Sequence, residues 1–81
     1  MTSMKEGKYY RYFDDLKNEF TVIKITYKKY QPDGCMYGVS LKYKLFCKPI
    51  VGNVGLIYTS KYYWDKNSRE LDEEEALVES I

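Results

Sequence analysis

The strongest constraint on this chain is a strict two-residue alternation over residues 39–48. Val, Leu, Tyr and Cys occupy the odd positions, and Ser, Lys and Phe occupy the even positions. Alternation of period two is typical of a β-strand with one face on a core. Residues 20–30 form a second long strand pattern, rich in β-branched and aromatic side chains. The sequence therefore predicts an antiparallel sheet built around these two strands.

Residues 31–35, between the two strands, predict how the strands pair. Pro32 fixes φ, and Gly34 can take the left-handed conformation that a three-residue hairpin loop needs. With Gln31 opposite Cys35, one apolar face results from the pairs Tyr27 with Val39, Ile25 with Leu41 and Ile23 with Tyr43. The other face is then expected to place Lys24 across from Lys42, and Phe20 across from Phe46.

Further strands and one helix complete the expected fold. The strands span about 8–13, 20–30, 37–48 and 54–64, and the helix about 72–81. Asp72 is the predicted N-cap, and Glu75 completes a capping box. Leu77, Val78 and Ile81 form an apolar stripe that should dock on the sheet, because so short a helix is unstable alone. We expect a single β-dominated α+β domain over residues 1–81, with a bent antiparallel sheet of about four strands.

Composition argues against several classes of function. The 81 residues can bury one core, and the absence of histidine removes the usual general base and the commonest metal ligand. Cys35 and Cys47 lie too far apart on an extended strand for a disulfide and are too few for a zinc site. We expect free thiols, no metal or other cofactor, no catalytic residue and no enzymatic activity. The lack of a signal-peptide or membrane-spanning pattern predicts a cytoplasmic protein without a membrane partner.

Charge is distributed unequally along the chain. Residues 1–64 carry 11 basic and 5 acidic side chains, a net +6, and residues 65–81 carry 2 and 7, a net −5, which together give +1. Lysines that face each other across strands favour an anionic partner, unless that face is simply solvated or covered by the protein's own acidic segment. The predicted basic binding face, with phenylalanines on which bases would stack, comprises Lys24, Lys28, Lys42, Lys44, Lys48, Phe20 and Phe46.

Ten tyrosines and one acidic run are the remaining candidates for binding. Tyrosine gives large contact area at low entropic cost, although in a small core its ring can also pack inward with the hydroxyl in water. The predicted aromatic interface comprises Tyr9, Tyr10, Tyr12, Tyr30, Tyr37, Tyr62 and Tyr63. The acidic run is Asp72, Glu73, Glu74 and Glu75. It would mimic a phosphate strand or dock on a basic partner, but capping and the helix dipole explain it equally well.

Residues 7–13, Gly-Lys-Tyr-Tyr-Arg-Tyr-Phe, followed by a turn and a long strand, resemble the start of several small SH3-like barrel domains. This resemblance implies closure of the sheet into such a barrel. A Tyr- and Lys-rich β unit that ends in an acidic helix is also similar in build to small phage-encoded anti-defence proteins, including anti-CRISPR inhibitors. That resemblance implies a steric inhibitor of a larger nucleoprotein, acting in the host cytoplasm, and gives no residue a role.

The sequence thus favours a small non-enzymatic binding protein that acts as a steric inhibitor or adaptor of a larger macromolecular partner, either a protein or a nucleoprotein. The alternative is a β module that binds nucleic acid directly through its Lys/aromatic sheet face. Salt dependence separates the two, because contacts with phosphates weaken steeply as salt rises. An exposed strand edge would also allow two copies to pair as a homodimer.

Overall fold

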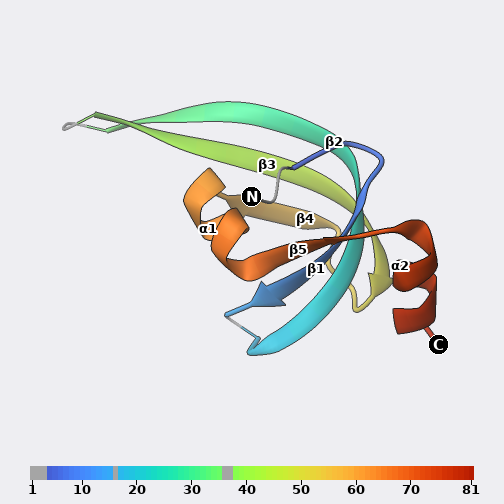
Figure 1. The fold of residues 1–81 in the computed structure, drawn as a ribbon. Helices are drawn as coiled ribbons and strands as arrows, with labels where there is room; N and C mark the ends of the chain where they lie inside the picture. Colours follow the sequence, from blue (N-terminus) through green and yellow to red (C-terminus); the bar gives the residue numbers. More distant parts are fainter. Residues whose placement is uncertain (1–3, 16, 36–37) are drawn as a thin grey trace.

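The computed structural model describes residues 4–15, 17–35 and 38–81, with the backbone alone for the described part of 31–41. The elements are β1 (Tyr9–Asp14), β2 (Glu19–Cys35), β3 (Gly38–Val51), β4 (Leu56–Thr59), α1 (Lys61–Asn67), β5 (Ser68–Leu71) and α2 (Glu73–Glu79). The five strands form an antiparallel sheet in the order β4-β3-β2-β1-β5 (Figure 1). The predicted β-dominated α+β class is confirmed, but the sheet has five strands rather than four.

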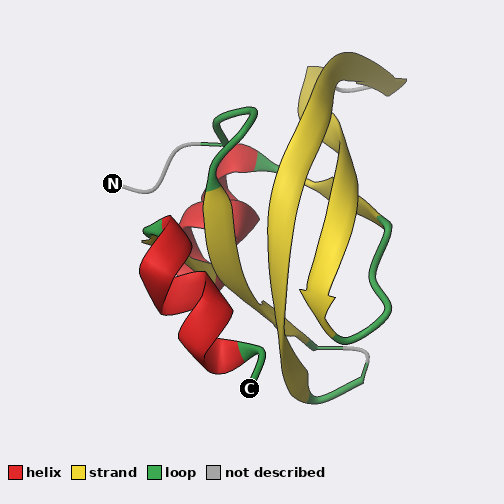
Figure 2. Cartoon of the chain, turned by 90° about the vertical axis from the view of Figure 1, so that its right-hand side faces the viewer, coloured by secondary structure: helices red, strands yellow, loops and turns green. Residues whose placement is uncertain are grey.

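β2 connects the two halves of the sheet. Its residues 19–24 pair with β1, and its residues 22–35 pair with β3. The strand bends between these partners, so that the sheet curves around one side of the molecule, as Figures 1 and 2 show. Beyond the core, β2 and β3 continue together as a long arm, which contributes to an elongated shape of 46 × 25 × 22 Å.

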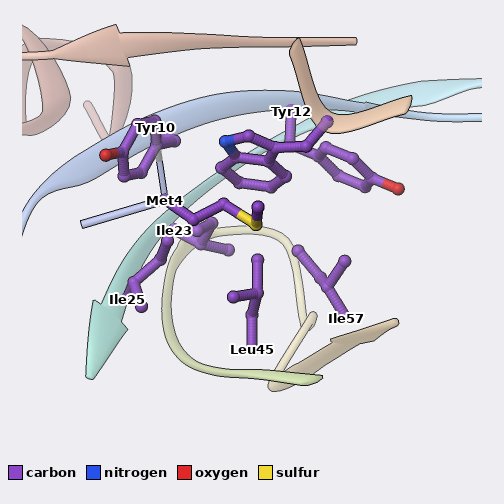
Figure 3. Packing of buried hydrophobic residues seen from close by; sticks show 8 residues of the cluster. Met4, Tyr10, Tyr12, Ile23, Ile25, Leu45 and Ile57 are labelled. Atoms are coloured by element: carbon purple, nitrogen blue, oxygen red, sulfur yellow. The ribbon is translucent and has the colours of Figure 1, made fainter. Parts of the chain in front are cut away.

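The main core lies inside this curved sheet and is centred on Trp64 of α1. The Trp64 ring makes an edge contact with Tyr10 at 5.1 Å between centroids and stacks on Tyr12 at 5.4 Å. Figure 3 shows the aliphatic members gathered beside these rings. The other buried members of this cluster are Met4, Ile23, Ile25, Leu45 and Ile57. Because they come from β1 to β4, α1 and the segment before β1, a single core holds the sheet and α1 together.

The register of β2 and β3 differs from the predicted one. Cys35 pairs with Gly38, and the two residues between them lie outside the described residues. Residues 31–35 belong to β2 instead of forming a loop, and the longer ladder satisfies backbone groups that a loop at this position would leave to water. The predicted pairs of Lys24 with Lys42 and of Phe20 with Phe46 are therefore wrong. Ile25 pairs with Cys47, and Ile23 with Pro49.

A β-bulge at Thr26 resets the alternation of β2. Ile25 pairs with Cys47 and Tyr27 with Phe46, so Thr26 is an extra residue without a ladder partner. Its Oγ1 donates a hydrogen bond to the carbonyl oxygen of Phe46 at 2.9 Å. One inserted residue reverses the direction of every side chain that follows. Tyr27, predicted on the apolar face with Ile25, is consequently 53% exposed on the opposite face.

The predicted strand over 54–64 is only partly correct. β4 ends at Thr59, and α1 begins after Ser60, whose side chain accepts a hydrogen bond from the Tyr63 backbone N–H. This cap and the burial of Trp64 outweigh the strand propensity of three consecutive aromatic residues. The chain then returns as β5, a fifth strand absent from the prediction, which pairs with β1.

The C-terminal helix has the predicted start but a different buried side. Asp72 is the N-cap, and its reciprocal hydrogen bonds with Glu75 complete the capping box. The predicted apolar stripe is wrong, because Leu77, Val78 and Ile81 are exposed. The small Ala76 is buried instead, in a second cluster with Val22 and Leu71, because α2 lies on the sheet through the turn that carries this residue. None of the helices in the described ranges is both long and apolar enough to cross a bilayer.

Candidate binding face

The outer face of β2, β3 and β4 mixes lysine with aromatic side chains. Lys44 pairs with Lys29 on one side and with Tyr58 on the other, and Phe46 pairs with Tyr27 and with Leu56. Residues directly opposite each other in a sheet project to the same side. We call this surface the Lys-aromatic face, and its members are Lys24, Tyr27, Lys29, Lys44, Phe46, Lys48, Leu56 and Tyr58.

Burial of the alternate residues fixes the orientation of this face. Leu45 and Ile57 pair with each other, are 0% and 4% exposed, and point into the core. Their neighbours along each strand must therefore point outward. Tyr27, Phe46, Leu56 and Tyr58 are between 37% and 60% exposed, so four large apolar side chains lie together at the surface. Exposed apolar groups that are contiguous and bordered by charge are typical of interaction sites.

The rings of this face are already organised. Tyr27 and Phe46 have centroids 5.7 Å apart at a tilt of 41°. The Lys44 Nζ lies 5.3 Å from the Phe46 ring centroid and 5.5 Å from that of Tyr58. Each such cation–π contact at an exposed site is worth about 0.5–1 kcal/mol. One ammonium group therefore links two rings and keeps the side chains in a defined arrangement.

Two pairs of lysines face each other on this surface. Lys24 is directly opposite Lys48, and Lys29 is directly opposite Lys44. Like charges in these positions destabilise a sheet. The sequence has no acidic residue within 20–32, in β3 or in β4, so the adjoining strand positions supply no neutralising carboxylate. The strands of this face therefore carry a net positive charge.

The acidic helix borders this face at one end. α2 packs over the end of β3 and over β1 and β5, where Ile50 and Val51 adjoin the second cluster (Figure 1). Lys24 Nζ lies 5.5 Å from the ring centroid of Tyr9, which packs against the same cluster. The carboxylates of Asp72 and Glu75 are engaged in the capping box, which gives these two residues a structural role.

The structure divides the predicted basic face. Lys24, Lys44, Lys48 and Phe46 lie together on the Lys-aromatic face. Lys28 pairs with Leu45, which places it on the core side of the sheet, with its Nζ 5.9 Å from the Tyr43 ring centroid.

Lys42 stays on the expected side of the sheet, whereas Phe20 lies away from the other members. Lys42 precedes Tyr43, which packs against the core, so Lys42 projects to the same side of the sheet as Lys44 and lines a shallow pocket with Tyr58. Phe20 pairs with Phe13 at 5.0 Å between centroids and lies beneath the Arg11 guanidinium. Lys28 and Phe20 are therefore separate from the Lys-aromatic face, whereas Lys42 lies at its edge.

The predicted aromatic interface is dispersed as well. Tyr10 and Tyr12 are buried and cannot contribute to an exposed surface. Tyr30 contacts Tyr43 at 5.4 Å on the arm, and Tyr62 is 77% exposed on α1. The remaining members are Tyr9, half-buried beside Lys24, Tyr63, half-buried on α1, and Tyr37, which lies outside the described residues.

The hydroxyls near α1 form a polar cluster with carboxylates from the end of β1. Tyr63 donates a hydrogen bond to the Asp15 carboxylate, and this bond raises the pKa of Tyr63 to about 12. The pKa of Tyr12 is also raised, first by burial and then by the negative charges of Asp14 and Asp15. Both phenols therefore keep their protons at neutral pH and act as hydrogen-bonding groups.

Cys47 is a free thiol of low reactivity. It is half-buried, and burial raises its pKa to about 11. Since the thiolate is the nucleophilic form, the thiol is inert at neutral pH. Within the described ranges, no three His, Cys, Asp or Glu side chains gather in a way that would hold a metal ion.

Sequence reasoning missed half of the Lys-aromatic face. Tyr27 and Lys29 escaped because the bulge at Thr26 leaves no clear mark in the sequence. Leu56 and Tyr58 flank the buried Ile57 in strict alternation, and this signal was sufficient to find them.

Comparison of the chain with protein-family models, with curated proteins and with solved structures found no match. Functional inference therefore depends on the chemistry of the surface.

Proposed function

We propose that this protein is a small non-enzymatic binding protein that acts as a steric inhibitor or adaptor, covering an anionic surface of a larger macromolecular partner. The observation that carries the proposal is the arrangement of two opposed lysine pairs around the exposed rings of Tyr27 and Phe46. Repulsion between the opposed lysines lowers the stability of the free protein. A negatively charged partner surface would attract the same lysines.

The apolar part of the face supports a protein or nucleoprotein as the partner. Leu56 offers no aromatic surface for base stacking, but beside Phe46 and Tyr58 it extends an apolar centre. Protein interfaces of ordinary size bury roughly 800 Å² on each side and combine such a centre with a charged rim. The lysines of β2 and β3 supply the rim on this surface.

The architecture also supports an SH3-like barrel as the finer description of the fold. β2 is shared by both halves of the curved sheet, and α1 joins β4 to β5. β4 is at one end of the strand order, and β1 is next to β5 at the other end. β1 and β4 nevertheless contribute to one core together with α1. A barrel of this kind would provide a rigid support, so that the face needs little ordering when it binds.

Direct binding of single-stranded nucleic acid is the second candidate. The tilted ring pair of Tyr27 and Phe46, with Lys29 and Lys44 two residues away along their strands, supports it. Stacking of a base on an aromatic side chain is worth about 1–3 kcal/mol, and lysines on either side would track the phosphates.

One variant tests both candidates. In Lys29→Glu/Lys44→Glu the central lysine pair is reversed, and in the control Lys17→Glu/Lys61→Glu two exposed lysines elsewhere are reversed. The wild type and the control, immobilised and exposed to extract from the native host, should retain the same partner, which the face variant should lose. Retention of that partner by the face variant would refute the proposal.

Fluorescence anisotropy with labelled oligonucleotides then distinguishes the two candidates. Saturable binding whose affinity falls steeply with salt, and is lost in the face variant, would favour nucleic acid. Capture of a protein partner together with no oligonucleotide binding at low salt would favour the steric inhibitor or adaptor.

A further inference from the structure

A second basic site lies outside the Lys-aromatic face, where β1 and β5 meet the end of α1. It is a shallow pocket of about 450 Å³. Its lining residues are Arg11, Phe13, Phe20, Lys66, Asn67, Ser68 and Arg69. Three of these side chains are cationic and none is acidic, so the pocket provides a concentrated positive charge. The chain regions that form it are separate from those that form the Lys-aromatic face, except for β2.

Two arginines face each other in this pocket. Arg11 of β1 pairs directly with Arg69 of β5, so both side chains project to the same side of the sheet. The Arg11 guanidinium carbon lies 4.0 Å from the centroid of Phe20, whose ring in turn contacts Phe13 at 5.0 Å. Stacking on Phe20 holds the Arg11 guanidinium in place and leaves its N–H groups at the rim of the ring for an acceptor.

The end of α1 contributes Lys66, Asn67 and Ser68 to the pocket. Carbonyl oxygens at a helix C-terminus are electronegative and would ordinarily repel a phosphate. Here Asn67 Nδ2 donates to the carbonyl of Tyr63, and Ser68 Oγ donates to the carbonyl of Trp64. These bonds hold both side chains in place at the end of the helix, and the Asn67 amide carries a second N–H for an acceptor. Lys66 is favoured at this position by the helix dipole in any case, but that effect does not explain the opposed arginines.

We propose that this pocket binds the phosphate group of a nucleotide, either as a free molecule or within a nucleic-acid strand. One guanidinium group can donate two parallel N–H hydrogen bonds to a phosphate, and it is therefore better suited to phosphate recognition than an ammonium group. The rings of Phe13 and Phe20 provide the adjacent surface for the base. This inference goes beyond the proposed function, because a different set of side chains carries it.

The test is an NMR titration of the ¹⁵N-labelled protein at constant low ionic strength, with inorganic phosphate, a mononucleotide and an eight-residue single-stranded DNA as separate probes. Saturable shifts are expected at the backbone amides of Arg11, Ser68 and Arg69. Arg11→Gln and Arg69→Gln should each lower the association constant about tenfold or more, as expected for loss of a charge-assisted hydrogen bond. The matched control, Lys61→Gln, removes one charge from α1 outside the pocket and should change it less than about twofold.

Comparison of the probes identifies the source of the phosphate. Equal affinity for the mononucleotide and the DNA would assign the pocket to free nucleotides. Higher affinity for the DNA, with shifts at the same amides, would assign it to a strand. Absence of saturable shifts, or an equal loss of binding in Lys61→Gln, would overturn the proposal.

Two further controls make the result decisive. Arg11 is half-buried against Phe20, so thermal unfolding of each variant is measured first, and the exposed Arg69 serves as the test if Arg11→Gln fails to fold. The Lys29→Glu/Lys44→Glu variant should keep phosphate binding at the pocket. Failure of the Lys-aromatic face to bind a partner would then leave this inference intact. Failure of the pocket to bind phosphate would likewise leave the proposed function of the Lys-aromatic face intact.

Discussion

β1 and β2 are neighbouring strands with a similar mixture of tyrosine and basic residues, yet they use these residues in opposite ways. In β1 uninterrupted alternation turns Tyr10 and Tyr12 into the core and Arg11 outward. In β2 the bulge at Thr26 interrupts the alternation and turns Tyr27 to the surface. The comparison teaches that the placement of one extra residue, more than composition, determines whether the aromatic side chains of a strand are buried or exposed.

The region around β1 and the Lys-aromatic face also differ in the partners of their polar groups. Near β1 two tyrosine hydroxyls have a defined partner: the Lys5 backbone N–H donates to the hydroxyl of Tyr10 at 2.9 Å, and Tyr63 donates to Asp15. On the Lys-aromatic face, like charges are opposed and rings remain exposed. The aromatic side chains of β1 are therefore partnered within the core, whereas those on the outer side of β2 to β4 are left exposed.

Truncation of Trp64 should have the largest effect on the β1 and α1 region. Trp64→Ala removes a fully buried ring that contacts both Tyr10 and Tyr12, and should lower the free energy of unfolding by about 3–5 kcal/mol. Urea denaturation followed by circular dichroism measures the change. Tyr62→Ala, on the same helix but 77% exposed, should change it by less than about 0.5 kcal/mol. Similar losses in the two variants would contradict the described core.

A smaller effect is expected at the turn that returns the chain from β3 to β4. Gly52 has φ +93°, and a Cβ there would lie 2.9 Å from the Thr21 Oγ1. Gly52→Ala should therefore cost about 1–3 kcal/mol and loosen β4 with its Leu56 and Tyr58. Gly55→Ala is the control, because its Cβ would meet only a carbonyl oxygen at 4.0 Å. If both substitutions were equally tolerated in thermal unfolding, the turn would not depend on the conformation of Gly52.

The titration of Tyr63 measures the effect of its hydrogen bond with Asp15 on the pKa of the hydroxyl. Its pKa is raised from 10 to about 12 in the folded protein, so the stability that its hydrogen bond with Asp15 contributes is complete below pH 10 and is lost between pH 10 and 12. Absorbance at the tyrosinate band should show late ionisation above pH 10, and its amplitude should fall by one tyrosine in Tyr63→Phe, because Tyr10 and Tyr12, whose pKa values are also raised, remain. An unchanged amplitude in the variant would assign the late step to other residues.

Much of the local structure was predictable from sequence because it depends on neighbouring residues. The capping box of Asp72 and Glu75 and the alternation around Leu45 are local patterns, and both are confirmed. The register was not predictable, because Pro32 and Gly34 have the composition of a turn but lie within β2. Only the pairing of the whole strand with β3 decides between these outcomes.

The candidate site was predictable only for residues outside the part of β2 that follows the bulge at Thr26. Lys44, Phe46 and Lys48 follow from the period of β3, whereas Tyr27 and Lys29 depend on the bulge at Thr26. The pocket of Arg11 and Arg69 was missed for another reason. It requires β5, a four-residue strand whose pairing with β1 joins residues almost sixty positions apart in the sequence.

The smallest predicted effect is a gain in stability, and it tests the meaning of the comparison. Lys29→Thr relieves the repulsion opposite Lys44 and should raise the free energy of unfolding by about 0.2–1 kcal/mol at low salt, with the gain shrinking as salt screens the charges. Lys17→Thr, which removes an exposed lysine outside the face, should bring no comparable gain. The same Lys29→Thr variant should bind the partner less tightly. A variant that is both more stable and weaker in binding shows that the opposed lysines are retained for recognition, whereas unchanged stability at low salt would mean that the face bears its charge without strain.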